Sequence, residues 1–295
     1  DLDGLQTQTR DSEVECLPAS TDPDNPEDVL TPLDGENGID NAVGGQLLPL
    51  VGLSPSVKSL PEDARSSHEA GQGTLIVYIT DYNGLRYDPR VQVLVAQAVA
   101  GTFLPASEVA FVDGELVEIE SGDPAPSPAW EGGDHWYVRD DAFKSPDLEQ
   151  PRISDQNAYV SNGKLVLHLR ESASILFFAG EATVTVRLSQ GVVLAELEED
   201  LSGVSRVNIG GRMSLDDVLE TGASAGVCEG TEVRELIETA VVGMADVLAE
   251  PGTAGGRSAI CDAVSVGVLF EGGVRGVGTP TLVESPPVSN PCETP

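Results

Sequence analysis

The sequence has few basic residues and no long apolar run, and each of these two shortages excludes a class of protein. Only 16 Lys and Arg oppose 49 Asp and Glu, which gives a net charge of −33. Nucleic acids and anionic membranes would be repelled at long range, so we exclude nucleic acid as a partner. Because no stretch of about 18 apolar residues occurs, we also expect no transmembrane segment.

The sequence also lacks the common catalytic motifs. GxSxG, HExxH, a P-loop and a dinucleotide-binding glycine motif are all missing. The three histidines, His68, His135 and His168, are scattered along the chain, and His168 is expected on the outer face of its strand. Carboxylates are so abundant that no acid pair stands out for glycoside hydrolysis. We therefore expect a protein that is not an enzyme, and keep a hydrolase as the last alternative.

The composition favours short strands and many turns. Val, Leu and Ala supply most of the apolar residues, and 32 Gly and 20 Pro interrupt them. Asn162-Gly163 predicts a type I′ hairpin turn, after which Leu165, Leu167 and Leu169 point to one face. We expect a mainly β fold, an antiparallel β-sandwich of the jelly-roll kind, with one or two packed helices.

Two helices and three regions are predicted from local signals. A capping box at Ser214–Asp217 predicts a short helix near 214–220. Apolar residues at helical spacing predict a second helix over 231–250, from a Thr231 cap to the Pro251-Gly252 stop. The regions are an acidic arm over 1–41 with a calcium-type loop, a β-sandwich domain over 42–285 and a Pro-rich tail over 286–295.

The four cysteines indicate disulfides and export. They lack the CxxC spacing of a zinc site, and the acidic, Gly- and Pro-rich composition favours disulfides over free buried thiols. Cys228 and Cys261 flank one predicted helix, and Cys16 and Cys292 lie near opposite ends of the chain. Of the three possible pairings we therefore expect Cys228 with Cys261 and Cys16 with Cys292. The chain begins at Asp1 without Met or an apolar signal region, which favours a processed mature chain, secreted or on the cell envelope surface.

The acidic arm ends in a loop with many oxygen ligands. Calcium binds six to eight oxygens, and glycine lets the backbone fold tightly around the ion. Residues 34–41 offer five oxygen-bearing side chains: Asp34, Glu36, Asn37, Asp40 and Asn41. The DGxxGxDN spacing resembles one thrombospondin type 3 calcium repeat, although Ala42 stands where that family has cysteine. The alternative is a solvated acidic turn in which Asn and Gly serve the backbone geometry.

A looser resemblance extends over most of the chain. Its features are Cys16, the 34–41 loop, Gly210-Gly211-Arg212-Met213, Met244-Ala245-Asp246 and the stretch from Cys261 to Gly267. In this layout the chain resembles uncharacterised secreted lipoproteins of the myxobacterial kind. The resemblance implies a location in the cell envelope and no particular activity.

The long connection over 113–157 holds both tryptophans. Trp130 and Trp136 lie six residues apart, and a candidate ligand site combines Trp130, Asp134, His135, Trp136 and Tyr137. Aromatic rings beside carboxylates suit sugar binding, because a ring stacks on the pyranose C–H surface while acids accept hydroxyl hydrogen bonds. The other interpretation, which we favour, is a hydrophobic plug that fixes the long loop to the sheet.

These features favour a secreted, calcium-stabilised binding module that recognises a glycan or another surface polymer. The first alternative is a structural subunit of a cell-surface assembly, in which the partners are copies of the same chain. The second alternative is the hydrolase.

The calcium expectation predicts a calcium-dependent melting temperature. An ion that binds only the native state stabilises it by mass action, so saturating calcium should raise the melting temperature of the wild-type protein. The double variant Asp34→Ala/Asp40→Ala should lose that rise, and magnesium serves as the control for ionic strength. Identical wild-type melting curves with and without calcium would refute the calcium site.

Overall fold

The structure is a computed structural model of the 295-residue chain. It describes the following residues: 2, 5, 9, 13–19, 34, 40–51, 59–112, 114–145, 148, 150–169, 172–179, 182–200, 203–251, 256–271, 280–285 and 291–292. Most of the predicted acidic arm and of the Pro-rich tail, including Glu36 and Asn37 of the predicted calcium loop, lies outside these residues.

The fold is mainly β, as predicted. The strands are β1 (Leu75–Thr80), β2 (Asp88–Thr102), β3 (Val109–Val112), β4 (Glu115–Glu118), β5 (His135–Arg139), β6 (Ile153–Ser161), β7 (Lys164–Leu169), β8 (Ala173–Ala179), β9 (Ala182–Leu197), β10 (Val204–Ser214), β11 (Ala263–Glu271) and β12 (Thr281–Val283). Ten of them form one sheet in the order β11-β10-β9-β7-β6-β2-β5-β12, with β1 beside β2 and β8 beside β9. The pairs are antiparallel except that β12 runs parallel to β5, so the sheet is mixed.

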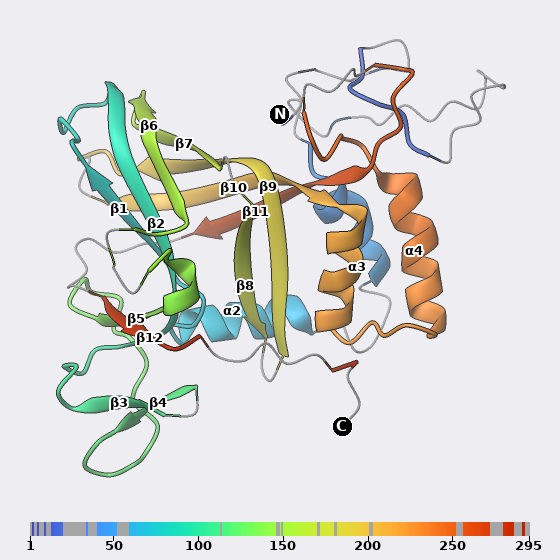
Figure 1. The fold of residues 1–295 in the computed structure, drawn as a ribbon. Helices are drawn as coiled ribbons and strands as arrows, with labels where there is room; N and C mark the ends of the chain where they lie inside the picture. Colours follow the sequence, from blue (N-terminus) through green and yellow to red (C-terminus); the bar gives the residue numbers. More distant parts are fainter. Residues whose placement is uncertain are drawn as a thin grey trace.

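A sharp bend in β9 turns this sheet into a sandwich-like fold. One half of β9 pairs with β8, and the other half pairs with β7 and β10. A bulge separates the halves, where Gln190 has a φ of +46° and the register with β10 shifts between Gly210 and Arg212. A Cβ on Gly191 would lie 2.4 Å from the Gly210 carbonyl oxygen, so the bend requires glycine there. Figure 1 shows β8 and the first half of β9 running across the strands of the other half.

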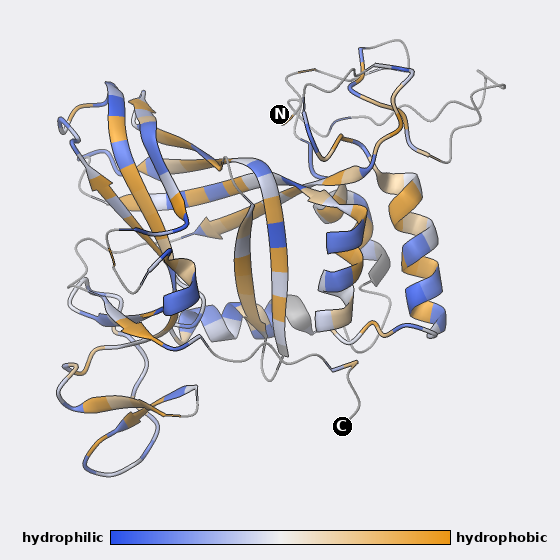
Figure 2. Ribbon diagram, viewed as in Figure 1, coloured by the Kyte–Doolittle hydropathy of each residue, from blue (hydrophilic) through white to orange (hydrophobic). Residues whose placement is uncertain are grey.

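The main core lies between these two halves of the sheet. Val93, Leu167, Ile175 and Val193 are among its buried members, and alternate residues of each strand supply it. The predicted hairpin turn is confirmed, since Asn162 and Gly163 have φ values of +53° and +76° and Ser161 pairs with Lys164. Figure 2 shows the alternation of polar and apolar residues along β2 and β9.

Helices pack on two sides of the sheet. They are the π-helix η1 (Val43–Leu47), α1 (Leu48–Val51), α2 (Leu60–Glu69), the 3-10 helix η2 (Asp140–Ala142), α3 (Leu215–Ser224) and α4 (Glu232–Met244). The predicted caps are confirmed, because the Ser214 side chain accepts the Asp217 N–H and the Thr231 side chain accepts the Arg234 N–H. The predicted end of the second helix is wrong. α4 ends at Met244 because Val247 forms a β-bridge with Ala263.

Both disulfides form, but the predicted pairing is wrong. Cys16 is bonded to Cys261 and Cys228 to Cys292, each with a Cα–Cα distance of 5.1 Å. The prediction assumed that cysteines flanking a helix meet. A helix of 13 residues is a rod about 20 Å long, whereas a disulfide spans about 5.5 Å between Cα atoms. Cys228 precedes α4 and Cys261 follows it, so the two lie toward opposite ends of that rod.

Contacts far apart in sequence explain the observed pairing. Leu17 forms a parallel bridge with Ile260, in which Leu17 N–H donates to Ala259 O and Cys261 N–H donates to Leu17 O. This bridge places Cys16 beside Cys261. Two disulfides are typical of proteins that mature in an oxidising compartment, which agrees with the expected export. No helix in the described part of the chain is long and apolar enough to cross a membrane.

A second, smaller core around Trp136 is packed too tightly to accept an added methyl group at Gly101. Gly101 lies flat against Trp136, and a Cβ there would approach the indole ring carbons to 2.3 Å. We expect Gly101→Ala to lower the free energy of unfolding by about 1–3 kcal/mol, as overpacking of a core does. Gly133→Ala, in the loop just before β5, is the matched control, because nothing lies within 4 Å of its added Cβ. Equal denaturant midpoints for the two variants would contradict this packing.

Candidate functional sites

The predicted tryptophan site is closed to a large ligand. Trp136 is 2% exposed and packs among Ile76, Ala98 and Val138, and Tyr137 is also buried. Buried Asp134 accepts the N–H groups of Ala129 and Trp130 at 2.7 and 2.9 Å, so its oxygens hold the loop.

Trp130 is half-buried, and its Nε1–H donates to Glu69 O at 3.0 Å. Its ring centroid lies 5.2 Å from that of Trp136. The ligand-site prediction is therefore corrected for Asp134, Trp136 and Tyr137, which fit the plug interpretation. His135 is half-buried, and His168 is exposed on β7 as its place in the strand predicted.

The predicted calcium ligands are only partly described. Asp40 Oδ2 accepts the Leu2 N–H at 2.5 Å. Asn41 Oδ1 accepts the N–H groups of Gly44 and Gly267 at 2.9 and 3.1 Å, so Asn41 ties the start of η1 to β11. That oxygen is committed to backbone donors, which argues against Asn41 as a ligand in this arrangement. Within the described ranges, no group of three or more acidic, His or Cys side chains is arranged to hold a metal, and calcium at residues 34–41 stays a prediction.

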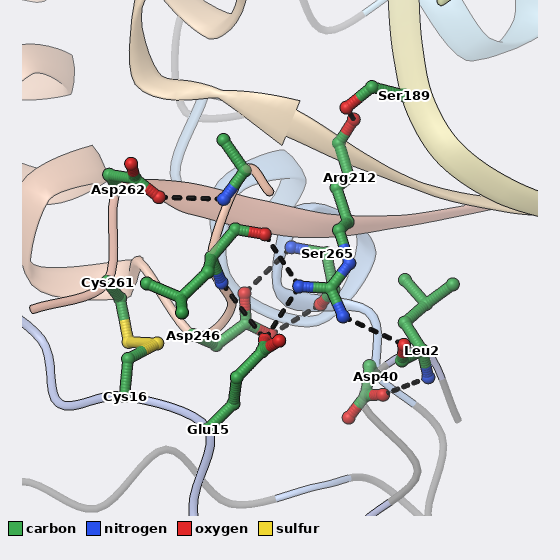
Figure 3. A network of polar contacts seen from close by, with 12 residues as sticks. Leu2, Glu15, Cys16, Asp40, Ser189, Arg212, Asp246, Cys261, Asp262 and Ser265 are labelled. Atoms are coloured by element: carbon green, nitrogen blue, oxygen red, sulfur yellow. Dashed lines mark hydrogen bonds and ion pairs between the residues drawn. A yellow bond between two sulfur atoms is a disulfide. The ribbon is translucent and has the colours of Figure 1, made fainter. Parts of the chain in front are cut away.

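A buried polar network fastens the first residues of the chain to the fold (Figure 3). Its centre is Arg212 at the end of β10, which is 1% exposed. Arg212 Nη1 donates to Glu15 Oε2 and to Leu248 O, both at 2.6 Å, and Nη2 donates to Leu2 O at 2.8 Å. Glu15 Oε2 also accepts the Leu248 N–H at 3.0 Å. Removing one partner of such a buried pair strands the other charge, which costs about 3–5 kcal/mol.

A buried carboxyl lies beside this pair. Asp246 follows α4, and its two oxygens accept the N–H and the hydroxyl of Ser265 on β11 at 2.7 and 2.5 Å. Ser265 Oγ in turn accepts the Ala42 N–H at 2.8 Å, which ties the start of η1 to the sheet. The pKa of Asp246 is raised from 3.8 to about 6, chiefly by burial and also by the charge of Asp40, while the Ser265 hydrogen bonds oppose the rise.

The network contains residues that sequence reasoning did not assign a role. Arg212, Asp246 and Ser265 all fall in the short motifs that carry the resemblance to secreted lipoproteins. The available signal was an arginine directly before the end of a Gly-rich, apolar strand. A charge in such a position needs a buried partner, but nothing local names that partner, since Glu15 lies 197 residues away.

A cleft between α2, β8 and β11 is the more accessible candidate site. It has a volume of about 450 Å³. Its walls are Arg65, His68, Glu69 and Gln72 from α2 and the turn after it, Leu176–Phe178 from β8, and Leu269–Glu271 from β11. These residues come from three separate parts of the chain, which is why the sequence alone did not reveal the cleft.

Aromatic rings meet at this cleft. Phe177 and Phe270 stack with centroids 6.2 Å apart and an interplanar angle of 14°. The His68 ring lies 5.8 Å from Phe270 and 5.7 Å from Trp130. Burial lowers the pKa of His68, opposed by a Gln72 backbone hydrogen bond and the Glu69 charge, so the imidazole is neutral at pH 7 and can donate and accept a hydrogen bond.

The carboxylates of the cleft are paired with arginines. Glu69 lies 3.0 Å from Arg65, and Glu271 lies 2.9 Å from Arg206. All four side chains are largely exposed, so each pair contributes little to stability. The arrangement can hold the apolar face of a small molecule against the rings while the polar rim bonds its hydroxyl or amide groups.

Comparisons of the chain with protein-family models, with curated proteins and with solved structures found no match.

The buried Asp246 predicts a pH-dependent stability. Because the folded protein holds this proton more tightly than the unfolded chain, the stability contribution is complete below about pH 4 and is lost as the pH rises through about 6. The difference between the two pKa values corresponds to about 3 kcal/mol. The quantity to compare is the difference in the free energy of unfolding between wild type and Asp246→Asn. We expect this difference, wild type minus variant, to fall by up to this amount between pH 4 and pH 7.

Denaturant titrations at each pH measure this difference. Asp123→Asn, an exposed carboxyl, is the control and should follow the wild-type profile. A difference between wild type and Asp246→Asn that stays constant from pH 4 to pH 8 would contradict the assignment.

Proposed function

We propose that the protein is a secreted binding module of the cell surface that holds a glycan, or another surface polymer, in the cleft between α2, β8 and β11. The observation that carries this proposal is the meeting of aromatic rings from three elements at one open cleft of about 450 Å³. A pyranose ring has an apolar C–H face that stacks on such rings. Its hydroxyl groups would bond to the rim, where Glu69, Gln72 and Glu271 supply polar atoms.

Binding is favoured over catalysis by the pairing of the cleft's acids. A glycosidase uses two carboxyl groups that flank the scissile bond. Glu69 and Glu271 are instead each held in an ion pair, with Arg65 at 3.0 Å and with Arg206 at 2.9 Å. The same proposal includes the calcium ion at residues 34–41 as a stabilising group and the envelope location that the lipoprotein resemblance implies.

A pair of exposed residues tests the cleft without opening the core. Leu269 lines the cleft and is 50% exposed, whereas Tyr78 on β1 is 61% exposed and does not line it. We expect Leu269→Ser to weaken retention on the bound polysaccharide at least tenfold, because an apolar contact and the fit of the sugar ring are lost together. Tyr78→Ser should bind like wild type.

Affinity electrophoresis against a panel of neutral and acidic polysaccharides measures this retention. Equal thermal melting of both variants and wild type shows that the fold is kept. If no polysaccharide is retained, or if Leu269→Ser is retained as well as wild type, the cleft is not a glycan site.

A further inference from the structure

A second candidate surface lies on the small β3–β4 hairpin, away from the cleft. The two strands form their own sheet and project from the body of the protein (Figure 1). One face of the hairpin is used internally. Val109, Phe111 and Leu116 on this face pack with Val99 and Tyr137 in a small core.

The opposite face of the hairpin carries apolar side chains that are half-buried or exposed. The strand register pairs Ala110 with Val117 and Val112 with Glu115. The Ile119 N–H donates to Glu108 O at 2.9 Å, so the same register continues to that pair. Alternation therefore places Ala110, Val112, Val117 and Ile119 on one face, with Glu108 and Glu115 at its two ends. Val112 is 48% exposed and Ile119 is 58% exposed.

One edge of the hairpin is also open. The Ala125 N–H donates to Leu116 O and the Glu118 N–H to Asp123 O, so residues 123–125 cover the outer edge of β4. β3 has no strand partner other than β4 among the described residues. Because Glu108 is hydrogen-bonded to Ile119 in β4, every second residue of β3 from Glu108 onward faces β4. The residues between them, Val109 and Phe111, therefore direct their backbone N–H and C=O groups to the open edge.

The charge around this face has one sign. No Lys or Arg occurs between Arg90 and Arg139, while Glu108, Glu115, Glu118, Glu120 and Asp123 surround the hairpin. A second copy of the chain would bring two acidic rims together, and each copy carries a net charge of −33. Like charges placed opposite one another disfavour a pair, whereas a basic partner is attracted at long range.

We propose that the β3–β4 hairpin is a docking element for a basic protein partner, which adds an extended segment to the open edge of β3. Apolar side chains of that segment cover Val112 and Ile119, and its Lys or Arg side chains pair with Glu108 and Glu115. Main-chain hydrogen bonds supply affinity in this mode, and alternate side chains supply specificity. This role is independent of the proposed glycan cleft.

A synthetic strand tests the proposal with a defined probe. The probe is a dye-labelled peptide of alternating Lys and Val, and a peptide of alternating Glu and Val is its charge control. We expect the Lys–Val peptide to bind the full-length wild-type protein in fluorescence anisotropy and the Glu–Val peptide not to bind. Binding should weaken as salt rises from 50 to 200 mM, because added salt shortens the distance over which charges attract to about 10 Å or less.

Two double variants separate docking from general charge attraction. Val112→Ser/Ile119→Ser should weaken binding at least tenfold, while Tyr78→Ser/Leu85→Ser, which changes two side chains that are each 61% exposed elsewhere, should leave it unchanged. Glu108→Gln/Glu115→Gln should weaken binding and reduce its salt dependence.

Three results would overturn the proposal. Equal peptide affinity in the hairpin variant and wild type would mean that the acidic surface attracts the peptide without a site. Binding of the Glu–Val peptide as tightly as the Lys–Val peptide would exclude charge complementarity. Self-association of the wild type in sedimentation, lost in the hairpin variant, would make a second copy the occupant.

Discussion

The bend in β9 is the constraint on which the rest of the fold depends. A flat sheet of this many strands would expose the apolar side chains on one of its faces to water. The bulge at Gln190 and the contact between Gly191 and Gly210 turn the first half of β9 across the second. The two halves of the sheet then pack with their apolar faces toward each other. As a result, β8 lies across strands with which it does not pair. The stack of Phe177 on Phe270 joins the two layers, so the aromatic cleft is a direct consequence of the bend.

A second constraint acts at the far end of β10, where the chain must bury a charge. Arg212 is held by the backbone carbonyls of Leu2 and Leu248 and by the Glu15 carboxylate, and these contacts help to hold the early residues against the sheet. The Cys16–Cys261 disulfide adjoins this pair and lowers the conformational entropy of the unfolded chain by closing a loop with a sequence separation of 245 residues. Each device supports the other, because the disulfide keeps Glu15 close and the ion pair would be costly to bury without it. The burial of Asp246 also has a cost. Because burial raises the pKa of this carboxyl group, its burial is less costly while it holds a proton.

The features that were predictable from sequence are those set by neighbouring residues. The Asn162-Gly163 turn and the helix starts at Ser214 and Thr231 depend on backbone geometry and on hydrogen bonds spanning two or three residues. The end of α4 was not predictable, because helix spacing continues past Met244 and only the bridge from Val247 to Ala263 stops it.

Long-range contacts explain the other misses. The disulfide pairing depends on the bridge between Leu17 and Ile260, which no local pattern encodes. Trp136 was placed in a ligand site because its neighbours are polar, yet the flat space above Gly101 accepts its ring. A glycine in the middle of a strand often marks such a close approach, but the sequence does not say which side chain makes it.

The acidic composition acts differently over long and short distances. At low salt the net charge of −33 repels anionic partners over tens of ångströms. At an ionic strength of about 0.1 M, salt screens this repulsion beyond about 10 Å. Close to the surface the individual pairs decide what can bind. At the cleft, Arg65 and Arg206 pair with the two glutamates of the rim and offset their charges locally. Residues 91–138, which include the hairpin, contain no Lys or Arg, and the face between Glu108 and Glu115 would suit the positively charged partner that we propose. The two proposed sites therefore differ in local charge, because arginines pair with the acids of the cleft and none occurs in the sequence around the hairpin.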